Sequence, residues 1–289
     1  MINSSTKLVG LLGDPVEHSK SPVMHNAVFD QLDLNYRYLA FQVKAEEVKE
    51  ALQGIKALGI KGVNVTIPHK EVVINSLDSL SKEAKLIGAV NTIENKEGRL
   101  IGHNTDGQGF MKALEKEGGF SAQGKKVLII GAGGAAKAVA FQLGLEGASE
   151  LYITNRTFES AVNLAKDLDE KLTLSKVKAF PLEEEALVND LPELDLIVDT
   201  TPIGMYPQTN IAPVIGDRLL EKSSLITDLV YNPVETVLLK RAKELGVKTV
   251  SGLGMLIYQG AIAFEIWTGQ KADVEVMKNA ILSQLELIN

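Results

Sequence analysis

The fold is decided by Lys126-Val127-Leu128-Ile129-Ile130, an apolar run that leads directly into Gly131-Ala132-Gly133-Gly134-Ala135-Ala136. An apolar helical pattern follows at residues 139–143. A buried strand that ends in a glycine-rich turn at the start of a helix is typical of a dinucleotide-binding unit. Gly131 then permits the tight turn, Gly133 lets the backbone approach a pyrophosphate, and Ala136 lets the helix pack closely on the strand. The alternative is that the glycines only form a tight corner.

The next predicted strand carries the signal for the type of dinucleotide. It spans Leu151-Tyr152-Ile153-Thr154, at about the expected distance of twenty residues, and ends in Asn155-Arg156-Thr157. NAD sites usually place an acidic residue here to bind the ribose, whereas an arginine suits the 2′-phosphate of NADP. We therefore expect NADP as the cofactor, unless Arg156 is an ordinary surface cation.

Composition excludes several classes of function. The chain has 289 residues, 45% of them hydrophobic, which is enough for two domains with cores of their own. Its net charge of −7 and its lack of a basic block argue against nucleic-acid binding. It has no cysteine, its four histidines lack metal-ligand spacing, and no signal peptide or membrane span is evident. We expect a soluble cytoplasmic protein without a metal site.

Two α/β patterns follow one another along the chain. Before the glycine-rich turn, strands are predicted at 8–12, 36–41, 63–67 and 89–93, with helices at 23–32, 48–58 and 83–87. This alternation predicts a largely parallel sheet that is covered on both faces. After it, strands are predicted at 126–130, 150–154, 177–180, 194–198, 225–228 and 247–250. The second pattern is that of a doubly wound, Rossmann-type domain.

Two helical patterns close the chain, at 253–267 and 274–288. The first is apolar around most of its circumference and therefore needs burial on several sides. We expect both helices to return to the leading domain. The predicted organisation is a substrate-binding catalytic domain at 1–106 plus 253–289, a dinucleotide-binding domain at 107–252, and a cleft between them.

Polar residues follow the strands of the leading domain, at the edge where open α/β sheets bind ligands. Ser19 and Ser21 lie at a helix start and can hold a carboxylate with help from the positive end of the helix. Alternatively, Ser21 caps that helix, with Pro22 at the first helical position.

Three further polar residues suggest acid–base chemistry and hydroxyl recognition. A partly desolvated Lys70 can exchange a proton with a substrate hydroxyl. Asn91 can bind vicinal hydroxyls, and Asp106 can accept a hydrogen bond or a proton. The alternatives are that Lys70 is a solvated surface residue and that Asp106 is a helix N-cap.

Taken together, these segments resemble the shikimate dehydrogenase family, including its shikimate/quinate dehydrogenase branch, over essentially the whole chain. The matching segments are Gly13-Asp14-Pro15, His18-Ser19-Lys20-Ser21-Pro22, His25-Asn26, Asn64-Val65-Thr66-Ile67-Pro68-His69-Lys70, Gly88-Ala89-Val90-Asn91-Thr92, Asn104-Thr105-Asp106-Gly107, Gly131-Ala132-Gly133-Gly134-Ala135, Asn155-Arg156-Thr157, Asp228-Leu229-Val230-Tyr231-Asn232-Pro233, and Gly252-Leu253-Gly254-Met255-Leu256 with Gln259 and Trp267. The resemblance implies NADP-dependent, reversible reduction of 3-dehydroshikimate to shikimate, a step in aromatic amino acid and chorismate biosynthesis.

The resemblance also implies roles for individual residues. Ser19 and Ser21 would hold the substrate carboxylate, while Lys70 and Asp106 would form the catalytic acid–base pair. The residues expected around the rest of the substrate are Thr66, Lys70, Asn91, Asp106, Tyr231 and Gln259. The residues expected at the cofactor are Gly131, Ala132, Gly133, Gly134, Ala135, Asn155, Arg156, Thr157, Thr201, Gly252 and Met255. No metal is needed, because a protonated lysine can polarise the reacting oxygen.

Two departures from the family pattern leave alternatives. NADP-selective relatives often carry a second arginine four residues after the first, where this chain has Ser160, so NAD remains an alternative cofactor. Many relatives have asparagine in place of Asp199, which puts the local hydrogen bonding in question. A polar pocket also admits one extra hydroxyl, as in quinate. One alternative is therefore a dual shikimate/quinate dehydrogenase that uses NAD or NADP. The other is a non-catalytic nucleotide- or metabolite-sensing protein. We expect the protein to be a monomer or a homodimer.

Overall fold

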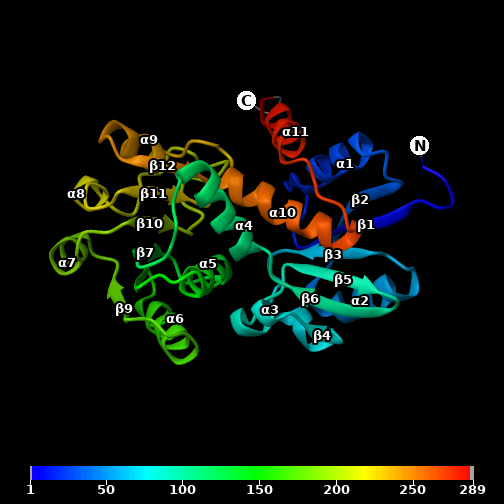
Figure 1. Cartoon of the computed structure of the whole chain (residues 1–289), viewed down its shortest axis with the longest axis horizontal. Coiled ribbons are helices and arrows are strands. Elements are labelled where there is room, and N and C mark those ends of the chain that lie inside the picture. Colours follow the sequence, from blue (N-terminus) through cyan, green and yellow to red (C-terminus); the bar gives the residue numbers. More distant parts are fainter. Residues whose placement is uncertain (1, 287–289) are drawn as a thin grey trace. The chain divides into compact units, whose positions relative to one another are not determined.

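The computed structural model describes residues 2–286 and divides the chain into two compact units. Unit 1 comprises Met1–Thr105 and Ile257–Asn289, and unit 2 comprises Asp106–Leu256. The chain therefore passes between the units at two points, before Asp106 and after Leu256. Each unit contains one six-stranded sheet with helices packed against it (Figure 1). Within residues 2–286, no helix is long and apolar enough to cross a membrane.

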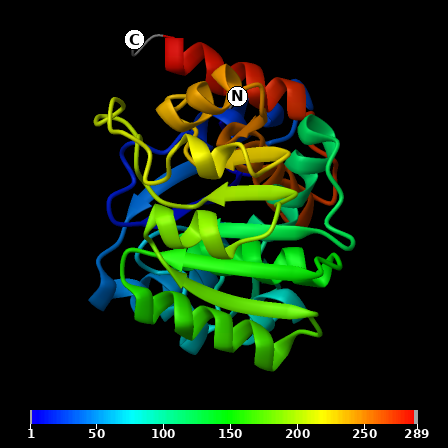
Figure 2. The same ribbon diagram turned by 90° about the vertical axis from the view of Figure 1, so that its left-hand side faces the viewer.

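Unit 2 is a doubly wound parallel sheet, as the sequence predicted. Its strands lie in the order β12-β11-β10-β7-β8-β9, with every pair parallel, and Figure 2 looks onto this unit. The strands are β7 (Lys126–Ile130), β8 (Glu150–Asn155), β9 (Lys176–Pro181), β10 (Leu196–Asp199), β11 (Leu225–Asp228) and β12 (Lys248–Ser251). The strand order reverses next to β7, and such a switch point is where open α/β sheets bind ligands.

Helices cover both faces of this sheet. They are α4 (Asp106–Ala113), its π-helical continuation η3 (Leu114–Gly118), α5 (Gly134–Leu145), α6 (Phe158–Lys171), α7 (Glu184–Asp190), α8 (Asp217–Leu220) and α9 (Val237–Glu244). Leu128 and Ile130 of β7 pack in one core with side chains of α7, α8 and α9. Val127 and Ile129 point to the opposite face and are also completely buried. A strand buried on both faces explains the unbroken apolar run in the sequence.

Unit 1 has a mixed sheet, which corrects the prediction of a largely parallel one. The order is β2-β1-β3-β5-β6-β4, and β5 is antiparallel to both β3 and β6. The strands are β1 (Lys7–Gly13), β2 (Tyr36–Gln42), β3 (Gly62–Val65), β4 (Ser79–Leu80), β5 (Thr92–Lys96) and β6 (Arg99–His103). The strand predicted at 89–93 was placed too early, and β4 and β6 were missed.

A tight hairpin explains this error. Glu97 and Gly98, which join β5 to β6, both have positive φ, of 55° and 85°. Two consecutive residues of this kind form the primed turn that connects antiparallel strands. The ends of β5 and β6 that flank the turn are polar and exposed, so they lack the apolar run on which the prediction relied.

Helices cover both faces of the unit 1 sheet (Figure 1). They are α1 (Ser21–Gln31), the 3-10 helix η1 (Ala45–Glu47), α2 (Val48–Ala57), the 3-10 helix η2 (Val72–Ser76), α3 (Lys82–Ile87), the second part of α10 (Gly252–Thr268) and α11 (Val274–Glu286). The last helix was predicted to reach residue 288, but residues 287 and 288 lie outside the described part of the chain. The core on the α2 face includes Leu12, Leu52 and Val63.

An aromatic cluster fills the other face, beneath α1 and α10. The His25 ring stacks flat on Tyr38, with centroids 4.5 Å apart, and also contacts Phe264 and Trp267. The Trp267 indole donates a hydrogen bond to the Ile93 carbonyl. Both ring nitrogens of His25 are buried, and neither has a hydrogen-bond partner among the described residues. This imidazole therefore acts as an aromatic core residue rather than as a polar one.

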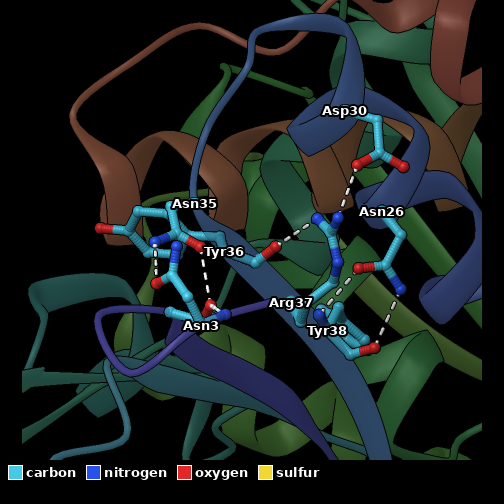
Figure 3. Close-up of polar contacts among 8 residues, drawn as sticks. Asn3, Asn26, Asp30, Asn35, Tyr36, Arg37 and Tyr38 are labelled. Carbon is cyan, nitrogen blue, oxygen red and sulfur yellow. Dashed lines mark hydrogen bonds and ion pairs between the residues drawn. The ribbon is translucent and has the colours of Figure 1, made fainter. Parts of the chain in front are cut away.

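Asn26 ties α1 to the edge strand β2 (Figure 3). Its side-chain amide accepts a hydrogen bond from the Tyr38 N–H at 2.9 Å and donates one to the Tyr38 carbonyl at 3.0 Å. The next turn of α1 adds an ion pair between Asp30 and Arg37 at 2.9 Å. These contacts fix the position of α1, whose first residue is Ser21.

The buried imidazole predicts an acid-sensitive contribution to stability. Burial lowers the pKa of His25 to about 3, so the folded protein binds fewer protons than the unfolded chain between that pH and about 6.5. The contribution of His25 to the free energy of unfolding is therefore fully present above the pKa of the unfolded state. It falls as the pH is lowered, by up to about 1.4 kcal/mol per pH unit. His25→Phe should keep the ring stacking and lose less stability between pH 7 and pH 5 in urea unfolding. An equal loss in both proteins would contradict this account.

Candidate functional site

A cradle with the backbone geometry of an anion site lies where β7 meets α5. Gly131 has a φ of +110°, and a Cβ there would lie 2.2 Å from Thr200 Oγ1, so only glycine fits. Its N–H donates to the Thr154 carbonyl, and the Thr200 hydroxyl donates to the Ile130 carbonyl. These bonds join the ends of three neighbouring strands and fix the turn.

Beyond Gly131 the turn opens. A Cβ on Gly133 or Gly134 would meet no atom within 4 Å, and Ala132 and Ala135 beside them are half-buried. Gly133 is the N-cap of α5, where no side chain caps the helix and the first turn has no acidic residue. The first N–H groups of α5 therefore have no side-chain acceptor, so these residues fit a cofactor pyrophosphate.

The end of β8 places a cation at the expected distance from the cradle. Arg156 and Thr157 are exposed, and the Asn155 side chain donates to the Thr157 carbonyl at 3.0 Å. Among residues 2–286, no carboxylate pairs with Arg156. Ser160 lies in the first turn of α6, and its N–H donates to the Thr157 carbonyl. Residues 155–157 offer one cation and one hydroxyl to a phosphate and no acid to a ribose diol, and the first carboxylate that follows, Glu159, lies in the first turn of α6.

Two buried carboxylates end β10 and β11, the neighbouring strands. Asp199 and Asp228 lie opposite one another in the ladder. Asp199 accepts a hydrogen bond from the Thr201 N–H at 2.8 Å. This is the hydrogen bond that an aspartate forms here, where many relatives have asparagine. Asp228 accepts bonds from the Val230 N–H and from the Thr236 hydroxyl, at 2.9 and 2.6 Å. Each carboxylate thus shapes the loop that carries a predicted ligand residue, Thr201 in one and Tyr231 in the other.

Burial raises the pKa of both carboxyl groups. It brings the pKa of Asp199 to about 6 and that of Asp228 to about 7, and the charge of Asp199 adds to the shift of Asp228. Burial likewise raises the pKa of the Tyr231 phenol. At neutral pH this end of the sheet therefore carries less negative charge than its two carboxyl groups suggest.

The start of α10 packs against the loop that carries Tyr231. A Cβ on Gly252 would lie 2.2 Å from the Leu229 carbonyl oxygen and 2.7 Å from that of Val230. Gly252 is buried, and Met255, one turn along α10, is half-buried. The predicted cofactor residues Gly252 and Met255 thus belong to unit 2 together with the cradle.

In unit 1 the two serines meet at the start of α1. Ser21 is the first residue of α1, and its N–H donates to Ser19 Oγ at 3.2 Å. The N-cap position belongs to Lys20, so the alternative that Ser21 caps this helix is wrong. Burial raises the pKa of the Tyr38 phenol well above its usual range, and a hydrogen bond with the Ser21 side chain opposes this effect.

A second group of predicted residues is joined by amide hydrogen bonds. The Asn91 side-chain nitrogen donates to Thr105 Oγ1 at 2.9 Å and to Gln259 Oε1 at 3.4 Å. Its oxygen accepts from the Thr105 N–H at 2.8 Å. Asn64 connects this group to Tyr38, because its oxygen accepts from the phenol at 2.8 Å and its nitrogen donates to the Asn91 carbonyl at 3.2 Å.

These contacts form one buried polar network in unit 1. Its members are Tyr38, Asn64, Asn91, Thr92, Thr105 and Gln259. Of these, sequence reasoning named Asn91 and Gln259 but gave no role to Tyr38, Asn64, Thr92 or Thr105. Asn64, Thr92 and Thr105 belong to the motifs shared with the family, and this could have marked them as site residues. Tyr38 lies in an ordinary strand pattern, so the sequence carried no signal that it belongs to the network.

The remaining predicted residues lie on connections between elements or, for Asp106, at the start of a helix. Thr66 follows β3 and is half-buried, and a Cβ on Gly13 would lie 2.3 Å from its methyl group. Lys70 is half-buried, and its carbonyl accepts from the Val90 N–H at 2.8 Å. Asp106 begins α4 in unit 2 and is buried. The pairing of Lys70 with Asp106 stays a prediction.

Within residues 2–286 no group of three or more acidic or histidine side chains could hold a metal ion.

Comparisons with known proteins cover nearly the whole chain. The family model described as "Shikimate dehydrogenase substrate binding domain" matches residues 11–93. Those described as "Shikimate / quinate 5-dehydrogenase" and "Shikimate 5'-dehydrogenase C-terminal domain" match residues 112–203 and 252–282. A shikimate dehydrogenase (NADP(+)) of Methanopyrus kandleri is 50% identical over 284 residues, which is 98% of each chain.

Two solved structures have the same fold. A crystal structure of a shikimate dehydrogenase in complex with NADP+ superposes with a TM-score of 0.90 at 50% identity, covering 99% of this chain and 98% of that one. A shikimate 5-dehydrogenase of Listeria monocytogenes, in complex with shikimate and NAD, gives a TM-score of 0.88 at 39% identity, covering 96% and 97%.

The pair of buried carboxyl groups predicts a stability loss toward alkaline pH. Because their folded pKa values lie above the ordinary value of about 3.9, the folded protein binds more protons than the unfolded chain. Stability is therefore lost as the pH rises through about 6 and about 7. Asp199→Asn removes one of these groups and lowers the pKa of the other. Between pH 5 and pH 8 this variant should lose less stability in urea unfolding, by on the order of 1–2 kcal/mol. Identical pH profiles would show that the carboxylates are already ionised in the folded protein.

Proposed function

The chain belongs to the shikimate dehydrogenase family, and we propose that it catalyses the NADP-dependent, reversible reduction of 3-dehydroshikimate to shikimate in the cytoplasm. The observation that carries this proposal is the buried polar network of unit 1. It joins a buried phenol to three side-chain amides within one unit, which suits a small acid with several hydroxyl groups.

Unit 1 is proposed to bind the substrate. Ser19 and Ser21 hold the carboxylate at the N-terminus of α1, where the helix dipole favours a negative charge. Asn91 and Gln259 bind ring hydroxyls with Thr66, and Tyr231, on the loop after β11 of unit 2, is proposed as a further substrate ligand. Asn91 and Gln259 are almost fully buried, so a hydroxyl that failed to pair with them would leave polar groups unsatisfied.

Unit 2 is proposed to bind NADP, which supplies the hydride that reduces the C3 carbonyl. Residues 131–135 receive the pyrophosphate, Asn155, Arg156 and Thr157 receive the adenosine phosphate, and Thr201, Gly252 and Met255 contact the rest. The raised pKa values of Asp199 and Asp228 support this assignment, because they reduce the negative charge beside an anionic cofactor.

Lys70 and Asp106 are proposed as the acid–base pair. In the reductive direction, protonated Lys70 donates its proton to the carbonyl oxygen while the hydride reaches C3, so the product is an alcohol and the lysine becomes neutral. In the oxidative direction, neutral Lys70 accepts the proton of the C3 hydroxyl. Asp106 orients that hydroxyl and stabilises the charged lysine.

A dual shikimate/quinate dehydrogenase is the second candidate. Arg156 is not followed by a second cation at Ser160, and the Listeria relative was crystallised with NAD. Under this alternative, the enzyme would turn over quinate or NAD at rates comparable to those with shikimate and NADP.

Initial rates in a two-by-two design decide between these candidates. Shikimate or quinate is combined with NADP or NAD, and nicotinamide reduction is followed by absorbance. We expect the highest kcat/KM with shikimate and NADP, and a loss of at least about 100-fold in kcat for Lys70→Ala, the scale of a lost general base. Shikimate affinity of Lys70→Ala is measured separately. Binding of both ligands without turnover in the unmodified protein would overturn the enzymatic reading and favour a sensor.

Arg156 should determine the choice between the cofactors. Arg156→Ala removes the cation proposed to meet the 2′-phosphate, which NAD lacks. The KM for NADP should rise about 5- to 20-fold, as for a lost charged hydrogen bond, while the KM for NAD stays within about twofold. Arg218→Ala, a change at another arginine of the same unit, serves as the control. Equal effects on both cofactors would show that Arg156 does not contact the phosphate.

A further inference from the structure

We propose that His69 is a positioning residue for Lys70, and that the hydrogen bond from its ring to the Val43 carbonyl holds the backbone of the acid–base residue in place. The proposal rests on the function proposed above, because it takes Lys70 as the residue that transfers the proton. None of the roles proposed above uses His69, although it directly precedes Lys70 and its side chain is completely buried.

The His69 ring makes one directed contact. Its Nε2 lies 2.6 Å from the Val43 carbonyl oxygen. A carbonyl can only accept, so Nε2 carries a proton and donates it. Nδ1 is buried and has no hydrogen-bond partner among the described residues. Among residues 2–286, the bond to Val43 is therefore the one hydrogen bond that orients the ring.

This bond ties the segment before Lys70 to the core of unit 1. Val43 directly follows β2 and belongs to the core on the α2 face, as does Val73. The His69 N–H donates to the Thr66 carbonyl at 2.9 Å, and the His69 carbonyl accepts from the Val73 N–H at 3.1 Å. The N–H, the carbonyl and Nε2 of His69 are thus all hydrogen-bonded, which fixes the backbone immediately before Lys70.

The backbone is also held at Lys70 itself. The Lys70 carbonyl accepts from the Val90 N–H at 2.8 Å, and Val90 precedes Asn91, a proposed ligand of the ring hydroxyls. The connection that carries Lys70 therefore has one anchor at the end of β2 and another beside Asn91. Only the anchor at His69 is made by a side chain, so a substitution can remove it and leave the other unchanged.

The chemistry proposed for Lys70 depends on such an anchor. A general acid or base must come within about 2.6–3.2 Å of the oxygen with which it exchanges the proton. A misplacement of about 1 Å can lower the rate about 100-fold. The four-carbon stem of a lysine is flexible, so the position of the ammonium group depends on a fixed backbone. Loss of the His69 anchor should therefore slow proton transfer more than it weakens substrate binding.

His69→Met and His69→Gln test this role as a pair. The two new side chains have nearly the same size, and only glutamine carries an N–H that can reach the Val43 carbonyl. His69→Met should lower kcat about 10- to 100-fold and leave the KM values for shikimate and NADP within about threefold. His69→Gln should keep kcat within about threefold of the unmodified enzyme. Equal losses of kcat in both variants, or changes confined to the KM values, would overturn the proposal.

A matched control separates positioning from stability. The Asn95 side-chain nitrogen donates to the Ile60 carbonyl at 2.8 Å, so it also ties two segments of unit 1 through a backbone carbonyl, and neither residue is a proposed ligand. Asn95→Leu should lower the melting temperature, as His69→Met also should, but leave kcat within about twofold. If both variants lose stability and their kcat values change alike, His69 has only a structural role and the proposal fails.

Lys70→Ala distinguishes failure of this inference from failure of the proposed function. If Lys70 transfers the proton, Lys70→Ala lowers kcat, and adding His69→Met lowers it by no more than about twofold further, because the group that His69 positions is gone. No effect of Lys70→Ala would sink the proposed acid–base pair and this inference with it. An effect of Lys70→Ala without one of His69→Met, or effects that simply multiply, would sink this inference alone.

A shorter amide covers the case in which His69→Met does not fold. His69→Asn keeps a polar side chain, but its nitrogen lies one bond closer to the backbone than that of glutamine and falls short of the Val43 carbonyl. His69→Asn should lower kcat about 10-fold or more relative to His69→Gln. Equal kcat values in these two amide variants would contradict the proposal.

Discussion

The hydrogen bond between Tyr38 and Asn64 is the interaction on which the arrangement of unit 1 depends. It joins the edge strand β2 to β3 across the intervening β1. Through it β2, the end of β3 and the start of β5 acquire a common polar contact inside the sheet. The same bond satisfies two buried groups, each of which would be costly if left alone. The Tyr38–Asn64 hydrogen bond therefore both connects the strands of unit 1 and aligns the polar side chains between them.

Unit 2 achieves its order differently, through backbone contacts and charge. Gly131 allows β7 to turn against Thr200, and the carboxylates of Asp199 and Asp228 hold the next two loops. Burial weakens the tendency of both carboxyl groups to ionise. The open first turn of α5 therefore faces a sheet edge that is less negative than its composition suggests, which favours an anion at that position.

The sequence predicted unit 2 well, because parallel strands such as β7 are buried on both faces and read as apolar runs. It predicted unit 1 less well, because β5 and β6 are partly polar and are joined by a turn whose first residue, Glu97, is not one of the usual turn residues. Among site residues, those on motifs could be named in advance. Tyr38 could not, since its role comes from strand order and from helix packing, and neither leaves a local pattern.

The way Asn26 binds Tyr38 also bears on the solubility of the protein. Strand β2 lies at the edge of its sheet, and an exposed edge normally offers a row of unpaired backbone groups to any other strand. Here the amide of Asn26 imitates a neighbouring strand at Tyr38, the third of the seven residues of β2. An incoming chain would find this pairing position already taken. The same side chain that anchors α1 thus protects the fold against edge-to-edge aggregation during and after folding.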